Sequence, residues 1–257
     1  MTDEQPVLYA VEGATARITL NRPEKRNALN EAVIAGLKES LRRAADDERV
    51  CVIVIAGAGK DFCSGADLAA LQQIAQASVD ENVEDAHSLL DLFLLIRQVP
   101  VPVVAAVTGR ALAGGAGLAS ACDLVVASES ARFGYPEVKI GFVPAMVMAI
   151  LRRNVSEKRA FELGTRGAEI TVQQAHAYGL VNEIFADEDF DHAVRSYVGG
   201  FEKLSRSAVS LTKTLLYQMD GLSFSAALQA GADVNVIARL TKDCQERVAR
   251  FLSKNQS

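Results

Sequence analysis

The pattern of hydrophobic and polar positions divides the chain into a first part that alternates strands with helices and a later helical part. Residues 30–47 place Val33, Leu37 and Leu41 four positions apart, which predicts a helix, and residues 85–98 predict another. Four runs rich in β-branched residues and bounded by turn residues predict strands, at 16–20, 50–57, 101–107 and 123–128. Strands that alternate with helices predict an α/β fold.

Helical patterns dominate the second half of the chain. We predict helices at 143–153, 171–179, 188–204, 207–218 and 223–254. One more strand is predicted at 179–185. Thr171 followed by Gln174 has the spacing of a capping box, which marks the start of a helix. We therefore expect an α/β core over residues 1–187, followed by a helical region for oligomer contacts over residues 188–257.

Composition and charge narrow the classes of partner. The chain has 49% hydrophobic and 23% charged residues, as expected for a globular protein that buries a core. Its net charge of −5 argues against a nucleic acid or an anionic membrane as the partner. The opening residues MTDEQPVLYA lack the apolar segment of a signal peptide, and the apolar run 99–107 is too short to cross a bilayer.

The cysteines and histidines predict neither a metal site nor a disulfide framework. The four cysteines lack CxxC spacing, and the three histidines are scattered along the chain. Cysteines without a pairing pattern fit a reducing compartment. We therefore expect a cytoplasmic protein that binds no metal ion.

Small residues dominate the run GRALAGGAGLASACD, from Gly109 to Asp123, which follows a predicted buried strand. The paired Gly114 and Gly115 stand where the strand turns into a helix, and they let a ligand approach the main chain closely. The first N–H groups of a helix are unpaired and can bind an anion or a developing oxyanion. Close packing of a helix on a strand also needs small residues, and this run alone does not decide between the two interpretations.

A second run, KDFCSGADLAAL at 60–71, repeats this arrangement after another predicted strand. It turns at Ser64, Gly65 and Ala66 and enters a helical stretch with Asp67 in its first turn. Two strand ends, each followed by a turn of small residues, can place two main-chain N–H groups around one oxygen atom. The two runs together predict an oxyanion hole.

Five motifs, in order along the chain, resemble those of the crotonase family, which includes enoyl-CoA hydratases and isomerases. The motifs are LNRPEKRNAL at 20–29, DFCSGADL at 61–68, ALAGGAGLASACDLVVAS at 111–128, FGYPEVKIGFVP at 133–144 and AEITVQQAHAYGLVNEIF at 168–185. The resemblance extends from about residue 8 to the end of the chain. It implies a crotonase-like α/β core of ββα repeats in a spiral, and C-terminal helices that form a homotrimer or a homohexamer.

The resemblance also implies catalytic roles. The N–H groups of Ala66 and Gly114 would bind the thioester oxygen of an acyl-CoA, and Glu137 would act as the general acid/base. Apolar neighbours such as Ile140 and Phe142 would raise the pKa of this carboxyl toward neutrality. Coenzyme A would be part of the substrate, so we expect no separate cofactor.

The implied substrate-binding residues lie in the same motifs. Lys25 and Arg26 would pair with phosphates of coenzyme A and Ala28 would line its adenine, although a solvated basic turn is the alternative for the two cations. Phe251 and Lys254 resemble positions that reach the coenzyme A of a neighbouring subunit, and a terminal helix face explains them equally well. The remaining substrate-binding positions are Ser64, Gly65, Asp67, Leu68, Gly115, Gly117 and Tyr135.

Gly117 departs from the family pattern, because hydratases with two glutamates carry their first catalytic carboxylate at this position. Glycine inside a helix costs about 1 kcal/mol relative to alanine, which we interpret as a need for space for a larger acyl group or a water. Tyr135, Asp67 or the acidic cluster 80–85 could replace the missing group, although a solvated helix start explains the cluster better. Met146, Val147 and Met148 are expected to pack in the core of a helix, and the less favoured alternative is that they line the acyl pocket.

Three functions remain open on the sequence. An enoyl-CoA hydratase or isomerase is the first, and Gly117 favours the isomerase on mechanism because one base suffices to move a double bond. Hydratases are the commoner members of the family. The second function is a non-catalytic acyl-CoA-binding homologue. The third is a decarboxylase, a thioesterase or an enzyme of carbon–carbon cleavage that uses the same oxyanion hole.

Overall fold

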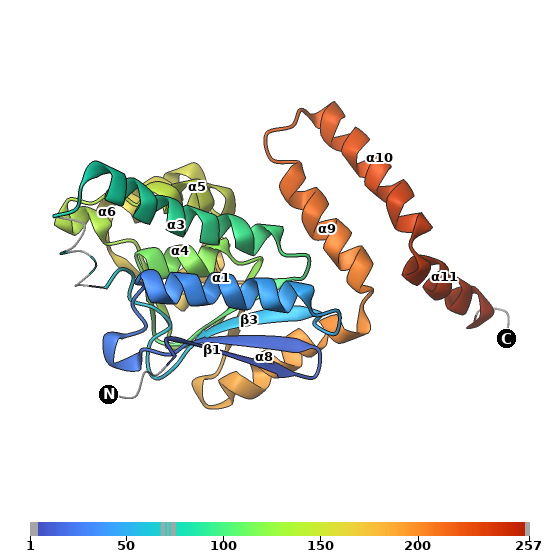
Figure 1. Ribbon diagram of the computed structural model, residues 1–257, viewed down its shortest axis with the longest axis horizontal. Helices are drawn as coiled ribbons and strands as arrows, with labels where there is room; N and C mark the ends of the chain where they lie inside the picture. Colours follow the sequence, from blue (N-terminus) through green and yellow to red (C-terminus); the bar gives the residue numbers. More distant parts are fainter. Residues whose placement is uncertain (1–4, 68–69, 71, 73–75, 255–257) are drawn as a thin grey trace.

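A six-stranded sheet forms the centre of the fold (Figure 1). The structure is a computed structural model that describes residues 5–67, 70, 72 and 76–254. In spatial order its strands are β1 (Val7–Glu12), β2 (Thr15–Leu20), β3 (Val52–Gly57), β4 (Val103–Val107), β6 (Leu124–Ser128) and β9 (Glu183–Phe185). The β1–β2 pair is an antiparallel hairpin, and the other pairs are parallel. The four strands predicted before residue 130 are thereby confirmed. The strand expected at 179–185 occupies only its last three residues.

A smaller sheet contains three short strands, β5 (Arg110–Leu112), β7 (Arg132–Gly134) and β8 (Glu169–Thr171). The pair β5–β7 is parallel and β7–β8 is antiparallel. Each strand has three residues, which is too short to show the alternation on which strand prediction depends. The hydrophobic pattern therefore predicts neither this sheet nor β1.

Helices cover both faces of the larger sheet. The helices of the core are α1 (Glu31–Asp46), α3 (Val79–Gln98), α4 (Gly114–Ala121), α5 (Ala145–Asn154), α6 (Glu157–Arg166), α7 (Val172–Tyr178) and α8 (Phe190–Gly199). In Figure 1, α1, α4 and α3 lie on one side of the sheet, and α8 lies on the other. Strand β3 accordingly alternates between two cores: Ile53 and Ile55 pack with the α1 side, and Val52 and Val54 with α8. This confirms that the strand is covered on both faces.

The remaining helices follow the core: α9 (Arg206–Gln218), α10 (Phe224–Leu240) and α11 (Lys242–Lys254). They extend away from the sheets in Figure 1. Helix α9 is anchored by Lys213, which is 7% exposed, donates to the carbonyls of Ile96 and Val101, and pairs with Asp123 at 2.7 Å. Helix α10 has no buried residue. The described helices include none with both the length and the hydropathy that crossing a bilayer requires.

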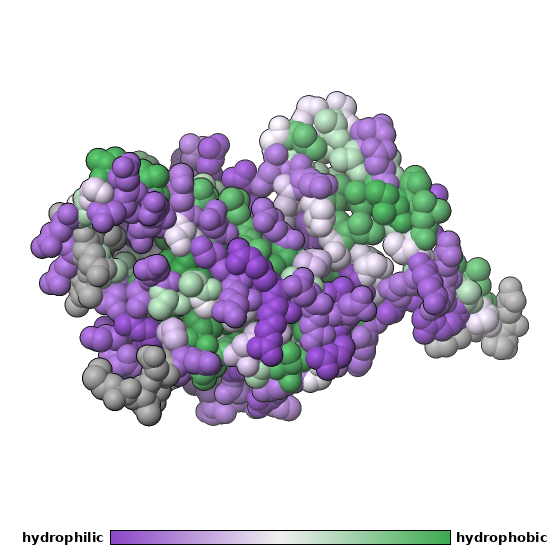
Figure 2. All heavy atoms as spheres, viewed as in Figure 1, coloured by the Kyte–Doolittle hydropathy of each residue, from purple (hydrophilic) through white to green (hydrophobic). Residues whose placement is uncertain are grey.

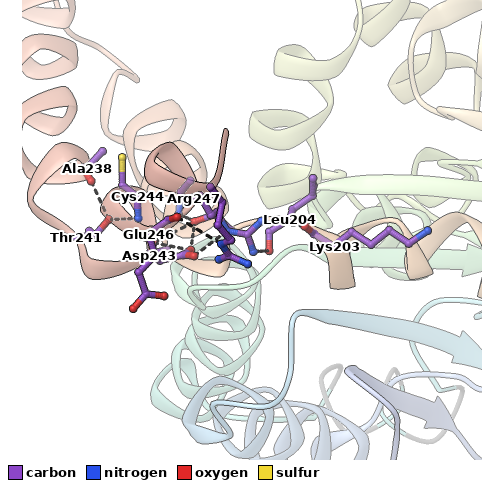
Figure 3. Close-up of polar contacts among 12 residues, drawn as sticks. Lys203, Leu204, Ala238, Thr241, Asp243, Cys244, Glu246 and Arg247 are labelled. Carbon is purple, nitrogen blue, oxygen red and sulfur yellow. Dashed lines mark hydrogen bonds and ion pairs between the residues drawn. The ribbon is translucent and has the colours of Figure 1, made fainter. Parts of the chain in front are cut away.

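The prediction of a single helix over 223–254 is wrong, because the helix is interrupted at Thr241, between α10 and α11 (Figure 3). Thr241 is extended, with φ −68° and ψ 139°, and its hydroxyl accepts the N–H of Cys244, which caps the start of α11. Arg247 then donates to the carbonyls of Lys203 and Leu204. These contacts turn α11 back toward the segment before α9.

Candidate active site

The turn at Ser64–Asp67 is held by hydrogen bonds on both of its sides. On one side, Cys63 donates to the carbonyl of Arg110 and accepts the N–H of Leu112. On the other side, Leu29 donates to the carbonyl of Gly65 at 2.7 Å and accepts the N–H of Asp67 at 3.0 Å. Because successive N–H groups of an extended segment point in opposite directions, the N–H of Ala66 points away from Leu29.

The second turn begins α4. Ala113 caps the helix with φ 49° and ψ −126°, an unusual conformation for a residue with a side chain, and its N–H donates to the carbonyl of Gly134. Such strain costs about 1–3 kcal/mol and marks a conformation that the surrounding structure enforces. Gly114 is the first residue of α4, so its N–H has no acceptor within the helix.

The two turns touch each other at Gly65. A Cβ atom added to Gly65 would lie 2.8 Å from the Cβ of Ala113 and 3.5 Å from the nitrogen of Gly114. Among the described residues, the N–H groups of Ala66 and Gly114 have no hydrogen-bond acceptor. The fold therefore brings two unpaired main-chain donors into neighbouring turns, which is the arrangement that binding one oxygen atom requires.

Glu137 reaches the same edge of the small sheet through β7. Strands β5 and β7 are parallel, with Leu112 opposite Gly134, so the segments that follow them, toward Gly114 and Glu137, leave the sheet side by side. Glu137 begins the 3-10 helix η2 (Glu137–Ile140). The Oε2 atom of Glu137 is buried and has no hydrogen-bond partner among the described residues.

Burial raises the pKa of the Glu137 carboxyl, against a smaller opposing effect of its own main-chain N–H. Of the apolar sequence neighbours expected around it, Ile140 is 65% and Phe142 is 44% exposed, whereas Tyr135 is fully buried. A buried carboxylate oxygen without a donor is costly, and such groups concentrate at functional sites.

Tyr135 does not present its hydroxyl to a substrate. The side chain is fully buried, and its hydroxyl is 2.9 Å from that of Ser120 in α4. Burial raises the pKa of Tyr135 to about 12. The suggestion that this phenol replaces the missing acid is therefore not supported. Tyr135 instead ties the segment that carries Glu137 to α4.

The two other glycines of α4 are packing positions. A Cβ atom on Gly115 would lie 2.3 Å from the carbonyl oxygen of Cys63, so this glycine lets α4 approach the first turn. A Cβ atom on Gly117 would lie 2.5 Å from Cγ2 of Val147 and 3.4 Å from Cζ of Phe93. The expected space for an acyl group or a water at Gly117 is therefore filled by two apolar side chains.

Helix α5, which carries Val147, packs as helix core. Val147 is buried on Gly117, and Met148 lies against Gly164 of α6, where a Cβ atom would be 2.4 Å from its Cε. Met146 is partly buried against the same core. These contacts favour the core interpretation of this segment over the acyl-pocket interpretation.

The turn expected to bind coenzyme A adjoins the first donor turn. Lys25 and Arg26 are exposed, and Ala28 is buried. The carbonyl of Arg26 accepts the N–H of Ser64, and its guanidinium lies 4.0 Å from the carboxylate of Asp61. Two exposed cationic side chains therefore lie in the turn that adjoins Ser64, where they can contact phosphates.

Both remaining alternative acids of the sequence analysis have structural surroundings of their own. Asp67 forms an ion pair with Arg22 at 2.7 Å. The cluster at 80–85 lies in the exposed start of α3, where Ser78 and Glu81 form a capping box, so it is a solvated helix start. Leu68 lies outside the described residues.

Phe251 is exposed and Lys254 is the last residue of α11. Figure 1 places α11 far from α4, the helix that begins at Gly114, so neither residue lies at this helix of the same chain. Contact with the site of another subunit stays a prediction.

Sequence reasoning missed several residues that support the site. Arg22 and Asn27 lie within the first motif. Asn27 has a positive φ, and asparagine is a typical turn residue that the sequence alone can reveal. Val147 and Phe93 fill the space beside Gly117, and nothing in the sequence pairs them with it. Among the described residues, no three side chains of His, Cys, Asp or Glu cluster as metal ligands would.

Comparisons with known proteins give close relatives over nearly the whole chain. Residues 10–257 match the family described as enoyl-CoA hydratase/isomerase. A Thermus thermophilus protein provisionally named an enoyl-CoA hydratase is 40% identical over 243 residues, covering 95% of this chain and 96% of that protein. The 2,3-dehydroadipyl-CoA hydratase of Escherichia coli is 34% identical over 239 residues, covering 92% and 91%.

Solved structures are equally similar. The crystal structure of an enoyl-CoA hydratase from Mycobacterium smegmatis has a TM-score of 0.92 and 32% identity, and covers 98% of this chain and 97% of its own. Human enoyl-CoA hydratase domain-containing protein 3 has a TM-score of 0.92 and 30% identity, with 97% and 98% covered. The arrangement of sheets and helices described above is therefore the one that these proteins share.

Proposed function

Because the chain belongs to the enoyl-CoA hydratase/isomerase family and has the crotonase-like α/β fold, we propose that it converts an enoyl-CoA thioester through an enolate. The N–H groups of Ala66 and Gly114 bind the thioester oxygen, on which negative charge develops. Glu137 transfers the proton. Lys25, Arg26 and Ala28 contact the coenzyme A part of the substrate. The reaction uses no metal ion or separate cofactor, so dialysis against a chelator is expected to leave the activity unchanged.

The observation that carries this proposal is the buried, unpartnered Oε2 of Glu137. A general base needs a lone pair that is available and a pKa close to the working pH. Burial removes competing donors and raises the pKa of this carboxyl in the direction of that pH. An ordinary surface glutamate would keep its oxygens in water.

Isomerisation of a 3-enoyl-CoA to a 2-enoyl-CoA is the reaction that one carboxylate can complete. Glu137 removes a proton from Cα, and the electron pair moves through the thioester to the oxygen held by the two N–H groups. The resulting dienolate then takes the same proton back at Cγ, which shifts the double bond and regenerates the carboxylate. Val147 and Phe93 occupy the position beside Gly117 from which a second carboxylate would act.

A homotrimer or homohexamer is the assembly that we propose. Helices α9 and α10 expose large apolar side chains: Leu216, Phe224, Leu228, Val236, Ile237 and Leu240. Figure 2 shows hydrophobic surface gathered over α10. A cleft lined by Met219, Phe224 and Leu228 runs along the same helices. Contiguous apolar surface of this kind marks a protein interface. Light scattering that shows a stable monomer at micromolar concentration would contradict this assembly.

The deciding experiment offers the wild type and Glu137→Gln separate samples of a 3-enoyl-CoA and a 2-enoyl-CoA, with products identified by mass spectrometry. We expect the wild type to form the 2-enoyl-CoA from the 3-enoyl-CoA, and the variant to lose this activity. Hydration of the 2-enoyl-CoA as the faster reaction would replace the isomerase with a hydratase. Binding without turnover of any thioester would indicate a non-catalytic homologue, and release of free coenzyme A would indicate a thioesterase.

A further inference from the structure

Arg22 joins the turn that carries Lys25 to the turn that carries Ala66. Its Nη1 donates to the carbonyl of Ala28 at 2.9 Å, and its Nη2 donates to the carboxylate of Asp67 at 2.7 Å. Its main-chain N–H donates to the side-chain oxygen of Asn27 at 2.9 Å. One guanidinium thus holds both turns, although Arg22 and Asp67 are 45 residues apart in sequence.

The ion pair is well shielded from water. The side chains of Arg22 and Asp67 are only 18% and 10% exposed. A short, charge-assisted hydrogen bond in such a setting is stronger and more directional than a pair on the surface. Arg17 and Asp191 form a surface counterpart, also between distant segments, with the aspartate 66% exposed.

Asp67 is fixed both by its side chain and by its main chain. Its carboxylate accepts from Arg22, and its N–H donates to the carbonyl of Leu29 at 3.0 Å. Leu29 in turn donates to the carbonyl of Gly65. The peptide groups on both sides of Ala66 are therefore held, and with them the direction in which the N–H of Ala66 points.

We propose that Arg22 and Asp67 are positioning residues for the oxygen-binding N–H of Ala66. Their ion pair holds this N–H in a fixed relation to the turn that contacts coenzyme A, so that binding of coenzyme A delivers the thioester oxygen to the donor. The proposal rests on the proposed function, because it assigns that donor to a thioester. A displacement of about 1 Å in such a group can cost about 10²-fold in rate.

The test compares Arg22→Met, Asp67→Asn and the double variant in steady-state kinetics. Each single variant is expected to lower kcat by about 10- to 100-fold with a smaller change in KM, and the double variant is expected to be no slower than the worse single variant. Arg22→Lys keeps the charge but cannot span both acceptors, so its kcat should lie in between. Arg17→Met and Asp191→Asn are the matched controls and should leave kcat unchanged.

A second readout separates positioning from stability alone. The infrared band of the thioester carbonyl in a bound saturated acyl-CoA reports how strongly the two donors polarise it. We expect a downward shift in the wild type and a smaller shift in Arg22→Met and Asp67→Asn, measured on protein that remains folded by circular dichroism. A carbonyl shift and a kcat equal to those of the wild type in both single variants would overturn the proposal.

Failure of the proposed function has a different outcome. Full activity of Glu137→Gln would reject the proton-transfer assignment, while the carbonyl shift would still test Arg22 and Asp67. Conversely, an inactive Glu137→Gln beside a fully active Arg22→Met would keep the proposed function and reject the positioning role.

Discussion

The two halves of the candidate site are built from different parts of the chain. The oxygen-binding half consists of the main-chain N–H groups of Ala66 and Gly114, which hydrogen bonds of neighbouring segments hold in place. The proton-transfer half is one side chain, Glu137, with an unpartnered oxygen. The first half therefore depends on backbone geometry and tolerates side-chain changes that preserve it, whereas the second half depends on a single functional group.

Glu137→Gln is expected to give the largest effect, because it removes the base while it preserves size and shape. Loss of general acid–base catalysis lowers kcat by about 10²- to 10⁴-fold. The amide still fits the site, so the KM for the enoyl-CoA should change little. Steady-state kinetics with purified variant and wild type measure both constants, and kcat within twofold of the wild type would reject the role of Glu137.

Gly65→Ala attacks the oxygen-binding half through the backbone. The added Cβ would lie 2.8 Å from that of Ala113, and the residue has φ +93°, so the two turns must separate. Loss of one such donor lowers kcat by about 10²- to 10³-fold. Gly221→Ala is the matched control, because Gly221 has φ +83° and nothing within 4 Å of an added Cβ.

Gly221→Ala places an alanine at a positive φ, as Gly65→Ala does, but its Cβ contacts no neighbouring atom. Both variants should lose stability from the positive φ, and Gly65→Ala should lose more because of the added contact, as thermal denaturation can measure. A Gly65→Ala variant with the kcat of Gly221→Ala would show that the approach of the two turns does not matter for the reaction.

Gly117→Glu places a second carboxylate where Val147 now packs. The new Cβ would lie 2.5 Å from Cγ2 of Val147, and such overpacking costs about 1–3 kcal/mol of stability. The double variant with Val147→Ala removes this contact and should recover part of the free energy of unfolding. It should also add water to a 2-enoyl-CoA faster than Gly117→Glu or Val147→Ala alone.

Denaturant unfolding and a hydration assay on the four proteins, including the wild type, check these two expectations. Equal stability of Gly117→Glu and the wild type would contradict the packing of Val147 against Gly117. Equal hydration rates in all four would show that the missing carboxylate is not what limits water addition.

The smallest expected effect is the pH dependence of stability due to Glu137. Because burial raises its pKa, folding favours the uncharged carboxyl. That contribution is fully present below the ordinary glutamate pKa of about 4.3, and it is lost as pH rises through the raised pKa. Glu137→Gln should therefore melt at a slightly higher temperature than the wild type at neutral pH, and the difference should close in acid.

The raised pKa of Glu137 affects activity in the opposite direction from stability, since it disfavours activity at low pH. The base must be deprotonated, so kcat/KM of the wild type should fall on the acid side at a higher pH than an ordinary glutamate would produce. An acid limb at the ordinary carboxyl pKa, together with no difference in melting temperature at neutral pH, would contradict the burial of this group.

Local patterns allowed much of the fold and of the site to be predicted. The apolar spacing of Val33, Leu37 and Leu41 predicted α1, and all three are buried. Small residues after two strands predicted the turns of Ala66 and Gly114, since turn chemistry is encoded within a few residues. The role of Glu137 came from the family motif, because a glutamate alone does not reveal its burial.

What could not be predicted depends on residues that meet only in the folded chain. Val147 fills the space at Gly117 from another helix, and Arg22 binds Asp67 across 45 residues. The hydroxyl of Tyr135 forms a hydrogen bond with that of Ser120 in α4, so Tyr135 does not replace the missing catalytic acid. The break at Thr241 could not be predicted from this one residue, because threonine caps helices but also occurs within them.

The most direct test of the central claim uses a 3-enoyl-CoA deuterated at Cα. One carboxylate that carries the proton from Cα to Cγ should deliver part of the deuterium to Cγ of the 2-enoyl-CoA product, as mass spectrometry and NMR can detect. Glu137→Gln should form this product at least about 10²-fold more slowly. Product that forms equally fast in the variant, or a 3-hydroxyacyl-CoA as the sole product of the wild type, would contradict the account.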